Sequence, residues 1–206
     1  MKRICPALIA LALLSAGEVR ADLESELSHR WRGAWVVVSR PLSSGCSGFY
    51  TDNEVRGELV TGKGDRRFQP GELAVVGKLN LKRSRVDLLL DLVEPLLDPH
   101  QEGPFTLYRE TLCKVQLQVP VPREWISGRD MDRLDALLHG IVERHADEAS
   151  ARGSSLWNRR VRAPYPADYQ QTLAAYELWR AEEMNVAVGE RLDESVKEAM
   201  RVVDRM

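Results

Sequence analysis

The chain has 206 residues and a net charge of −2, from 29 Lys and Arg against 31 Asp and Glu. Hydrophobic residues make up 44% of it and charged residues 29%, which is typical of a folded soluble protein and excludes a disordered, collagen-like or low-complexity chain. The near-neutral balance argues against a general nucleic-acid binder, because such a protein needs a basic excess to neutralise phosphates.

The N-terminus has the three-part pattern of a secretory signal peptide. Lys2 and Arg3 precede an apolar run at residues 7–14, and Ala21 ends a stretch with the small residues of a cleavage site. The apolar run is shorter than the roughly 20 residues that span a bilayer. We therefore predict that residues 1–21 are a signal peptide. The mature chain is expected to be exported, periplasmic or secreted, with no transmembrane segment.

The residues that follow have the sequence pattern of short β-strands, and we predict a small β-barrel domain at residues 22–122. Its clearest strand places Val115, Leu117 and Val119 on one face and polar residues on the other, which is typical of a half-buried antiparallel strand. Turn-forming residues separate five or six such runs, and residues 82–85 predict a tight turn between two of them. Together these features predict a small antiparallel β-barrel or sandwich of five to six strands.

The C-terminal part changes to a helical period, so residues 123–206 are predicted to be a helical region with two to three helices. An apolar stripe that begins after Asp130 predicts a helix running to about Ser150. A second pattern follows Pro166 and predicts one very long helix, or two helices divided near Gly189; its apolar residues are Tyr169, Leu173, Tyr176, Met184, Val188, Leu192, Val196 and Val203. The expected fold class is therefore α+β, with a β-barrel or sandwich followed by a helical C-terminal half.

Two cysteines remain after the predicted signal peptide, Cys46 and Cys113. In an oxidising compartment an even pair predicts a disulfide, and closing this long loop is worth about 4 kcal/mol in the chain-entropy model. The alternative is two buried thiols. Neither cysteine lies in a CxxC motif or beside a histidine, so the pattern favours neither redox catalysis nor zinc binding.

The motifs that carry chemistry are weak, and we predict no catalytic residue, no cofactor and no metal site. Ser47 fits the G-x-S-x-G pattern of serine hydrolases only loosely, and we expect it in a loop. His139 and His145 would point away from each other on one helix. The triplet at residues 33–35 resembles the G-x-W of lipocalins, but it covers three residues and lipocalins need eight strands, so we assign no family.

A connector rich in arginine and aromatic residues precedes the final helix. It contains Trp157, Arg159, Arg160 and Arg162. Arginine beside an aromatic ring can bind an anionic or carbohydrate ligand, which makes these residues a candidate binding site. The alternative is a solvated connector in which Trp157 packs into the core and the arginines pair with the acidic helices.

Three functional hypotheses follow. The favoured one is an exported, non-enzymatic protein that acts by protein–protein or cell-envelope interaction, with its amphipathic helices as the surface for a protein partner. The second is a binding module for an anionic or carbohydrate ligand. The third is a hydrolase of an envelope polymer, with Asp87, Asp91 or Glu94 supplying acid and base, although the strand pattern predicts Asp87 and Asp91 on a solvated face. The sequence leaves the oligomeric state open.

Overall fold

The computed structural model describes residues 22–203, so the predicted signal peptide lies outside the described residues. The chain divides into two compact units. The first, called here the sheet unit, comprises Met1–Leu96 and Glu110–Arg162. The second, the hairpin–helix unit, comprises Leu97–Arg109 and Ala163–Met206.

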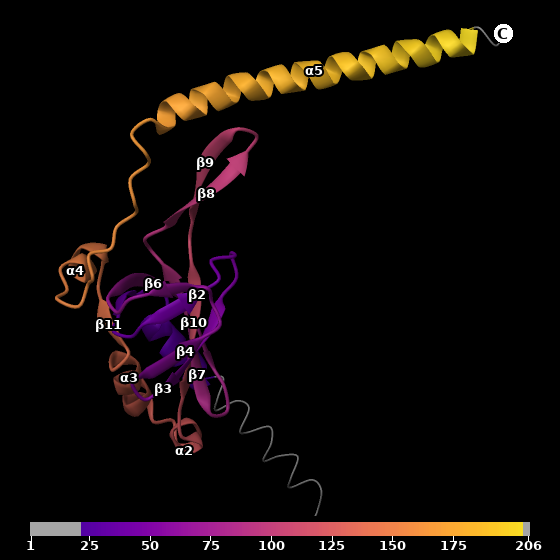
Figure 1. Cartoon of the computed structure of the whole chain (residues 1–206). Helices are drawn as coiled ribbons and strands as arrows, with labels where there is room; N and C mark the ends of the chain where they lie inside the picture. Colours follow the sequence, from indigo (N-terminus) through magenta and orange to yellow (C-terminus); the bar gives the residue numbers. More distant parts are fainter. Residues whose placement is uncertain (1–21, 204–206) are drawn as a thin grey trace, which may run out of the picture. The chain divides into compact units, whose positions relative to one another are not determined.

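The sheet unit is built on a curled sheet of seven strands (Figure 1). Their order is β11-β1-β6-β7-β10-β3-β4; β10 and β3 are parallel and the other neighbours antiparallel. The strands are β1 (Trp35–Val38), β3 (Thr51–Arg56), β4 (Leu59–Gly62), β6 (Glu72–Leu81), β7 (Arg85–Leu92), β10 (Lys114–Pro120) and β11 (Val142–His145). The prediction of a closed barrel of five to six strands is therefore wrong, because the sheet is a half-barrel whose edge strands β4 and β11 do not pair with each other. The broader prediction of a mixed α+β fold is confirmed.

The centre of the sheet follows from the apolar patterns of β6, β7 and β10. Leu88 and Leu90 of β7 lie opposite Leu117 and Val115 of β10, and all four are fully buried. The predicted turn is also correct, since β6 ends at Leu81 and β7 begins at Arg85. Burying side chains of this size contributes about 1.5–3 kcal/mol each, so these strands form the core of the unit.

The first described residues form a helix over residues 22–31 that covers the core. Leu23, Leu27 and Trp31 lie four residues apart, so they share one helical face, and each is at most 1% exposed. The indole Nε1 of Trp31 donates a hydrogen bond of 2.8 Å to Asp135. This bond ties the first helix to α3 (Met131–His139), on which Asp135 lies.

The predicted continuous helix from Asp130 to Ser150 is wrong. The chain forms α3, then strand β11, then α4 (Glu148–Arg152). The reason is long-range pairing: Val142 aligns with Val38 on β1, so this segment gains a strand partner that local periodicity does not reveal. Asp147 then starts α4 with a reciprocal capping box to Ser150. Another short helix, α2 (Arg123–Ser127), precedes α3.

A two-stranded ribbon of β2 (Leu42–Ser44) and β5 (Arg66–Phe68) packs on the sheet. The amide of Asn53 holds it in place, because its Oδ1 accepts from the Ser43 backbone N–H at 2.8 Å and its Nδ2 donates to the Ser43 carbonyl at 2.9 Å. Next to this ribbon, Cys46 and Cys113 form a disulfide with an S–S distance of 2.06 Å, so the predicted bridge is confirmed.

The hairpin–helix unit contains most of the hairpin of β8 (Leu96–Glu102) and β9 (Phe105–Thr111), and the helix α5 (Tyr169–Val203). Helix α5 is continuous over 35 residues, so the alternative of two helices divided near Gly189 is wrong. At 1.5 Å per residue this helix is about 50 Å long. Among the described residues, no helix combines the length and the apolar character that crossing a membrane requires.

Candidate functional site

The predicted ligand-binding arginines are engaged in ion pairs within the sheet unit. The guanidinium of Arg160 contacts the carboxylate of Glu72, with Nη2–Oε2 at 2.7 Å and Nε–Oε2 at 2.8 Å. Glu72 is 1% exposed, and Arg160 also donates to the backbone carbonyl of Glu94 at 2.9 Å. A carboxylate therefore already occupies the face of Arg160 that an anionic ligand would use.

Glu94 organises the rest of the connector. Its side chain is buried and accepts hydrogen bonds from the Arg152 guanidinium at 2.6 Å and from the backbone N–H of Arg162 at 3.0 Å. The guanidinium of Arg162 lies 3.1 Å from Glu110. The acidic partners of Arg160 and Arg162 thus come from β6, β9 and the bend after β7, whereas Arg152 also pairs at 2.8 Å with Glu148 on helix α4, as the connector alternative expected of its arginines.

The other two predicted residues lie differently. Trp157 packs against Val37 and Leu73 under the guanidinium of Arg152, which lies 5.3 Å from the ring centre. Arg159 is exposed, with φ at +60°. The structure therefore does not gather the four residues around one open space, and a ligand at the connector stays a prediction. Glu72 was not among the predicted site residues. It is the first residue of the apolar segment ELAVVGKLNL, and a single acid at the start of such a segment is the pattern that could have indicated a buried ion pair.

The carboxylates of the hydrolase hypothesis are structural partners in the described residues. Asp87 is 2% exposed and lies 2.8 Å from the Nε of Arg85, so the predicted solvated position of Asp87 is wrong. Asp91 accepts a hydrogen bond of 3.0 Å from the Tyr50 hydroxyl. Burial and this bond raise the pKa of Tyr50 above its ordinary value of 10.0.

Four residues along a strand separate Asp87 and Asp91 by about 13 Å. Paired glycosidase carboxylates are about 5–9.5 Å apart, so this spacing gives the hypothesis no support.

His139 ends α3 whereas His145 lies on β11, so the prediction that both stand on one helix is wrong. The rings of His139 and Trp31 lie 4.9 Å apart, and His145 on β11 lies 3.5 Å from Glu143. Within the part of the chain that the structure describes, no three His, Cys, Asp or Glu residues come together as metal ligands.

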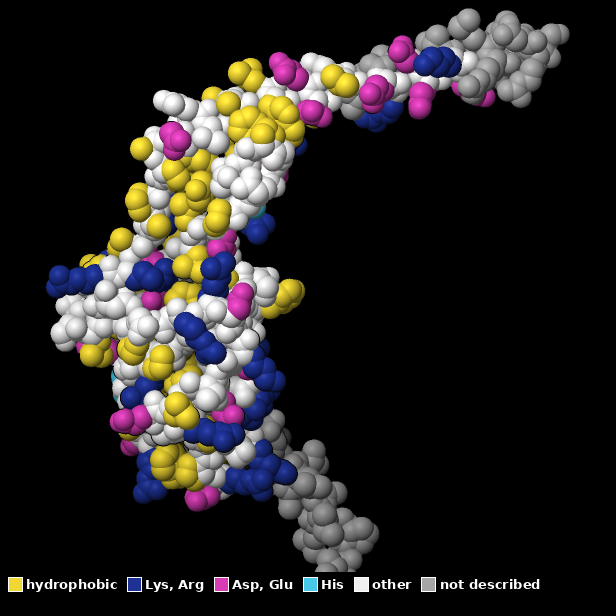
Figure 2. All heavy atoms as spheres, in the orientation of Figure 1, with side chains coloured by type: hydrophobic (Ala, Val, Ile, Leu, Met, Phe, Trp, Pro, Cys, Tyr) yellow, Lys and Arg dark blue, Asp and Glu magenta, His cyan; other side chains and the backbone are white. Residues whose placement is uncertain are grey.

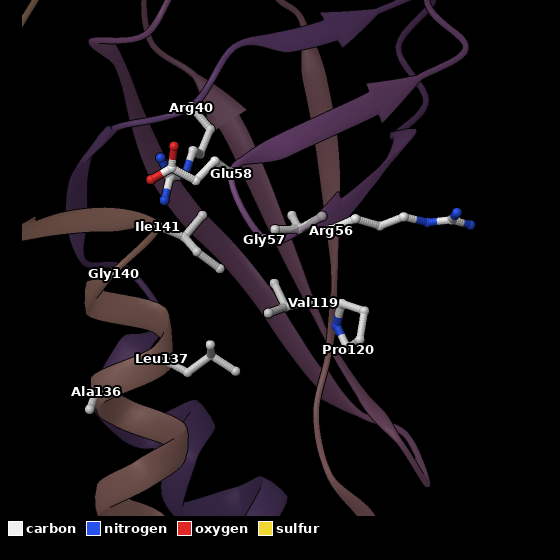
Figure 3. Close-up of a pocket in the computed structure, with 11 residues that line it drawn as sticks. Arg40, Arg56, Gly57, Glu58, Val119, Pro120, Ala136, Leu137, Gly140 and Ile141 are labelled. Carbon is white, nitrogen blue, oxygen red and sulfur yellow. The ribbon is translucent and has the colours of Figure 1, made fainter.

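A pocket of about 560 Å³ opens in the sheet unit between the β3–β4 turn, the end of β10 and helix α3 (Figure 3). Its apolar wall includes the buried side chains of Val55, Val119 and Ile141. Arg40 and Glu58 stand at one end of it, while the side chain of Arg56 points away (Figure 3). The volume is within the range of about 300–1,000 Å³ that is usual for small-molecule sites.

A second surface belongs to the hairpin–helix unit, where aromatic rings join the hairpin to the first turns of α5. Phe105 lies 5.9 Å from Tyr176 and 5.8 Å from Trp179, and Tyr108 lies 5.3 Å from Tyr169, between ring centres. The Tyr176 hydroxyl donates a hydrogen bond to Glu102. At the tip of the hairpin, a Cβ on Gly103 would collide with the Trp179 ring.

Directly after this aromatic cluster, the next two turns of α5 are open to solvent. Every side chain from Arg180 to Val186 is exposed, and Met184 and Val186 are 59% and 61% exposed. Leu178 is 71% exposed, because at 100° per residue it lies opposite Tyr176, the side chain that packs on the hairpin. Figure 2 shows charged side chains interspersed along this part of α5. We call residues 178 and 180–186 the exposed α5 segment.

Comparison with protein-family models, with curated proteins and with solved structures finds no match.

Proposed function

We propose that the protein is an exported, non-enzymatic protein that acts by protein–protein or cell-envelope interaction. In this proposal the sheet unit is a stable scaffold and α5 supplies the interaction surface. The observation that carries the proposal is the exposed α5 segment, where Leu178, Met184 and Val186 stand in water on a helix whose ring contacts with the hairpin, among the described side chains, lie in its first turns.

A helix as long as α5, with 35 residues, depends on packing for its stability. Isolated helices are marginal in water, and most helical stability in proteins comes from packing an amphipathic face. The aromatic cluster provides that packing up to Trp179, and the described side chains of the next two turns contact solvent. Covering one exposed Leu, Met or Val contributes about 1.5–3 kcal/mol, so a partner that covers this segment gains affinity and stabilises the helix.

Site-specific photo-cross-linking in the native cells tests this proposal. A photoreactive residue replaces Met184 and, as a matched control on the sheet unit, Leu112, which is 56% exposed. We expect position 184 to give one defined protein adduct and position 112 to give none. The charged variant Val186→Glu should reduce that adduct at least tenfold, whereas Phe49→Glu, at a 78% exposed residue of the sheet unit, should leave it unchanged.

Two results would overturn the proposal. One is a lack of any adduct at positions 178, 184 and 186 at native expression, and the other is an adduct that survives Val186→Glu. Export is tested separately by the intact mass of protein from the native source. We expect that mass to lack residues 1–21, and a mass that retains them argues against a cleaved signal peptide.

A further inference from the structure

The pocket beneath the β3–β4 turn combines an apolar wall with one positively charged end. Val55, Val119 and Ile141 are 4%, 2% and 4% exposed, so their side chains form a fixed surface that belongs to the core of the sheet unit. The pocket is also lined by Gly57, where an added Cβ would meet nothing within 4 Å. Space beside a fixed apolar wall suits an alkyl chain rather than a polar solute.

The charged end contains a hydrogen-bond donor without an acceptor. The Nε–H of Arg40 is shielded from solvent and has no hydrogen-bond partner in the described part of the chain. A buried donor left unpaired costs about 1–3 kcal/mol, and charged groups cost more. The guanidinium of Arg40 also lines the pocket and carries further N–H donors on its outer nitrogens, so a carboxylate in the pocket can pair with it, which makes Arg40 the polar anchor of the pocket.

The neighbouring charges restrict the kind of anion. Arg56 forms a two-pronged pair with Glu54, with both nitrogen–oxygen distances at 3.0 Å, and points away from the pocket (Figure 3). Glu58 stands at the same end as Arg40 and adds a negative charge there (Figure 3). Since one guanidinium faces the pocket beside an acid, a singly charged carboxylate fits better than a phosphate, which would bring up to two negative charges.

We propose that this pocket binds an amphipathic carboxylate, with its alkyl chain against Val55, Val119 and Ile141 and its carboxylate on Arg40. The site lies in the sheet unit and does not depend on the interaction proposed for α5. The ligand class that fits this pocket is a medium-length alkyl carboxylic acid.

Isothermal titration calorimetry with octanoate on the full mature chain tests the proposal. Octanol supplies the same chain without the charge, and acetate supplies the charge without the chain. We expect octanoate to bind at one site at least tenfold more tightly than either control, because the pocket contributes both an apolar wall and a charged anchor.

Matched variants locate the site. Arg40→Gln should weaken octanoate binding at least tenfold and leave the weaker octanol binding unchanged, whereas Arg56→Gln should change neither. Glu58→Gln should tighten octanoate binding, because it removes a competing negative charge. Ala136→Trp, at an exposed residue of α3 that lines the pocket, should block both ligands without disturbing the fold, as circular dichroism can verify.

The proposal fails if octanoate does not bind, if octanol binds as tightly as octanoate, or if Arg40→Gln and Arg56→Gln weaken octanoate equally. Equal weakening would show a general effect of surface charge instead of an anchor in the pocket.

Discussion

The sheet unit and the hairpin–helix unit use apolar residues in opposite ways. In the sheet unit, side chains such as Leu88 and Leu117 are fully buried, and a disulfide and buried ion pairs link distant parts of the chain. In the hairpin–helix unit, Leu107 and Tyr176 are the buried hydrophobic residues among those described, while Leu178 and Met184 face solvent. The first unit therefore has an extensive buried core of its own, whereas the second has few buried apolar side chains among those described and leaves on α5 the surface that the proposed partner would cover.

The largest expected effect on this comparison comes from the disulfide. Replacing both Cys46 and Cys113 with Ala should lower the free energy of unfolding of the sheet unit by about 4 kcal/mol, because a loop with a sequence separation of 67 is no longer closed. Urea denaturation of the oxidised wild type and the double variant measures the difference. As a control, a reducing agent should destabilise the wild type and leave the double variant unchanged. A loss below about 1 kcal/mol would show that the bridge is not a major support of this unit.

The buried ion pair of Glu72 and Arg160 provides the next test. Glu72→Gln removes the charge but keeps the size, and we expect a loss of about 3 kcal/mol because Arg160 loses its buried partner. Glu54→Gln breaks the exposed pair with Arg56, whose side chains are 44% and 69% exposed, and should cost less than about 0.5 kcal/mol. Equal losses in urea denaturation would contradict the idea that the connector is fixed by buried charge.

The aromatic cluster tests whether the hairpin–helix unit can open independently. Phe105→Ala removes the ring that contacts both Tyr176 and Trp179, and we expect a local loss of about 2 kcal/mol. Hydrogen exchange measured by mass spectrometry should become at least tenfold faster in residues 97–109 and in the first turns of α5, and stay unchanged in β7. Faster exchange in β7 as well would show that the two units unfold together.

The smallest expected effect concerns pH. The hydrogen bond to Glu102 raises the pKa of Tyr176 above its ordinary value of 10.0. Because the folded-state pKa is the higher one, the contribution to stability is fully present below pH 10 and is lost as the pH rises through the folded-state pKa. Absorbance titrations at alkaline pH should be recorded for the wild type and for Tyr176→Phe. The difference between the two curves should show that the Tyr176 hydroxyl ionises at a higher pH than an ordinary tyrosine. Glu102→Gln should return this ionisation towards pH 10, and an unchanged titration would contradict the role of Glu102.

Local sequence patterns predicted the features that depend on neighbours in the chain. The alternation of Val115, Leu117 and Val119 predicted β10, and turn-forming residues located the β6–β7 turn. The pairing of the two remaining cysteines also followed from the sequence once export was assumed. The strand and the turn each depend on a few adjacent residues. For the two cysteines, the sequence had to distinguish only a disulfide from two buried thiols.

The candidate sites were harder to predict, because their residues come from separate parts of the chain. The pocket joins Arg40, Val55, Val119 and Ile141, whose spacing follows no motif. The arginines of the connector suggested a free anion site, yet Arg160 finds its partner in Glu72 on β6. Residues 142–145 continued a helical pattern but pair with β1 as a strand. Tertiary hydrogen bonds outweigh local propensity at such positions.

The sequence alone determined an α+β protein with a disulfide, a β-rich first part and a long amphipathic helix near its end, since composition and periodicity are properties of neighbouring residues. Only the tertiary structure decided that the sheet stays open, that the connector's charges are paired and that an apolar pocket lies beside Arg40. The physical reason is that strand partners, ion pairs and cavities require contacts between residues that are distant in the sequence. Burial of the hydrophobic core as a whole determines which of these contacts form.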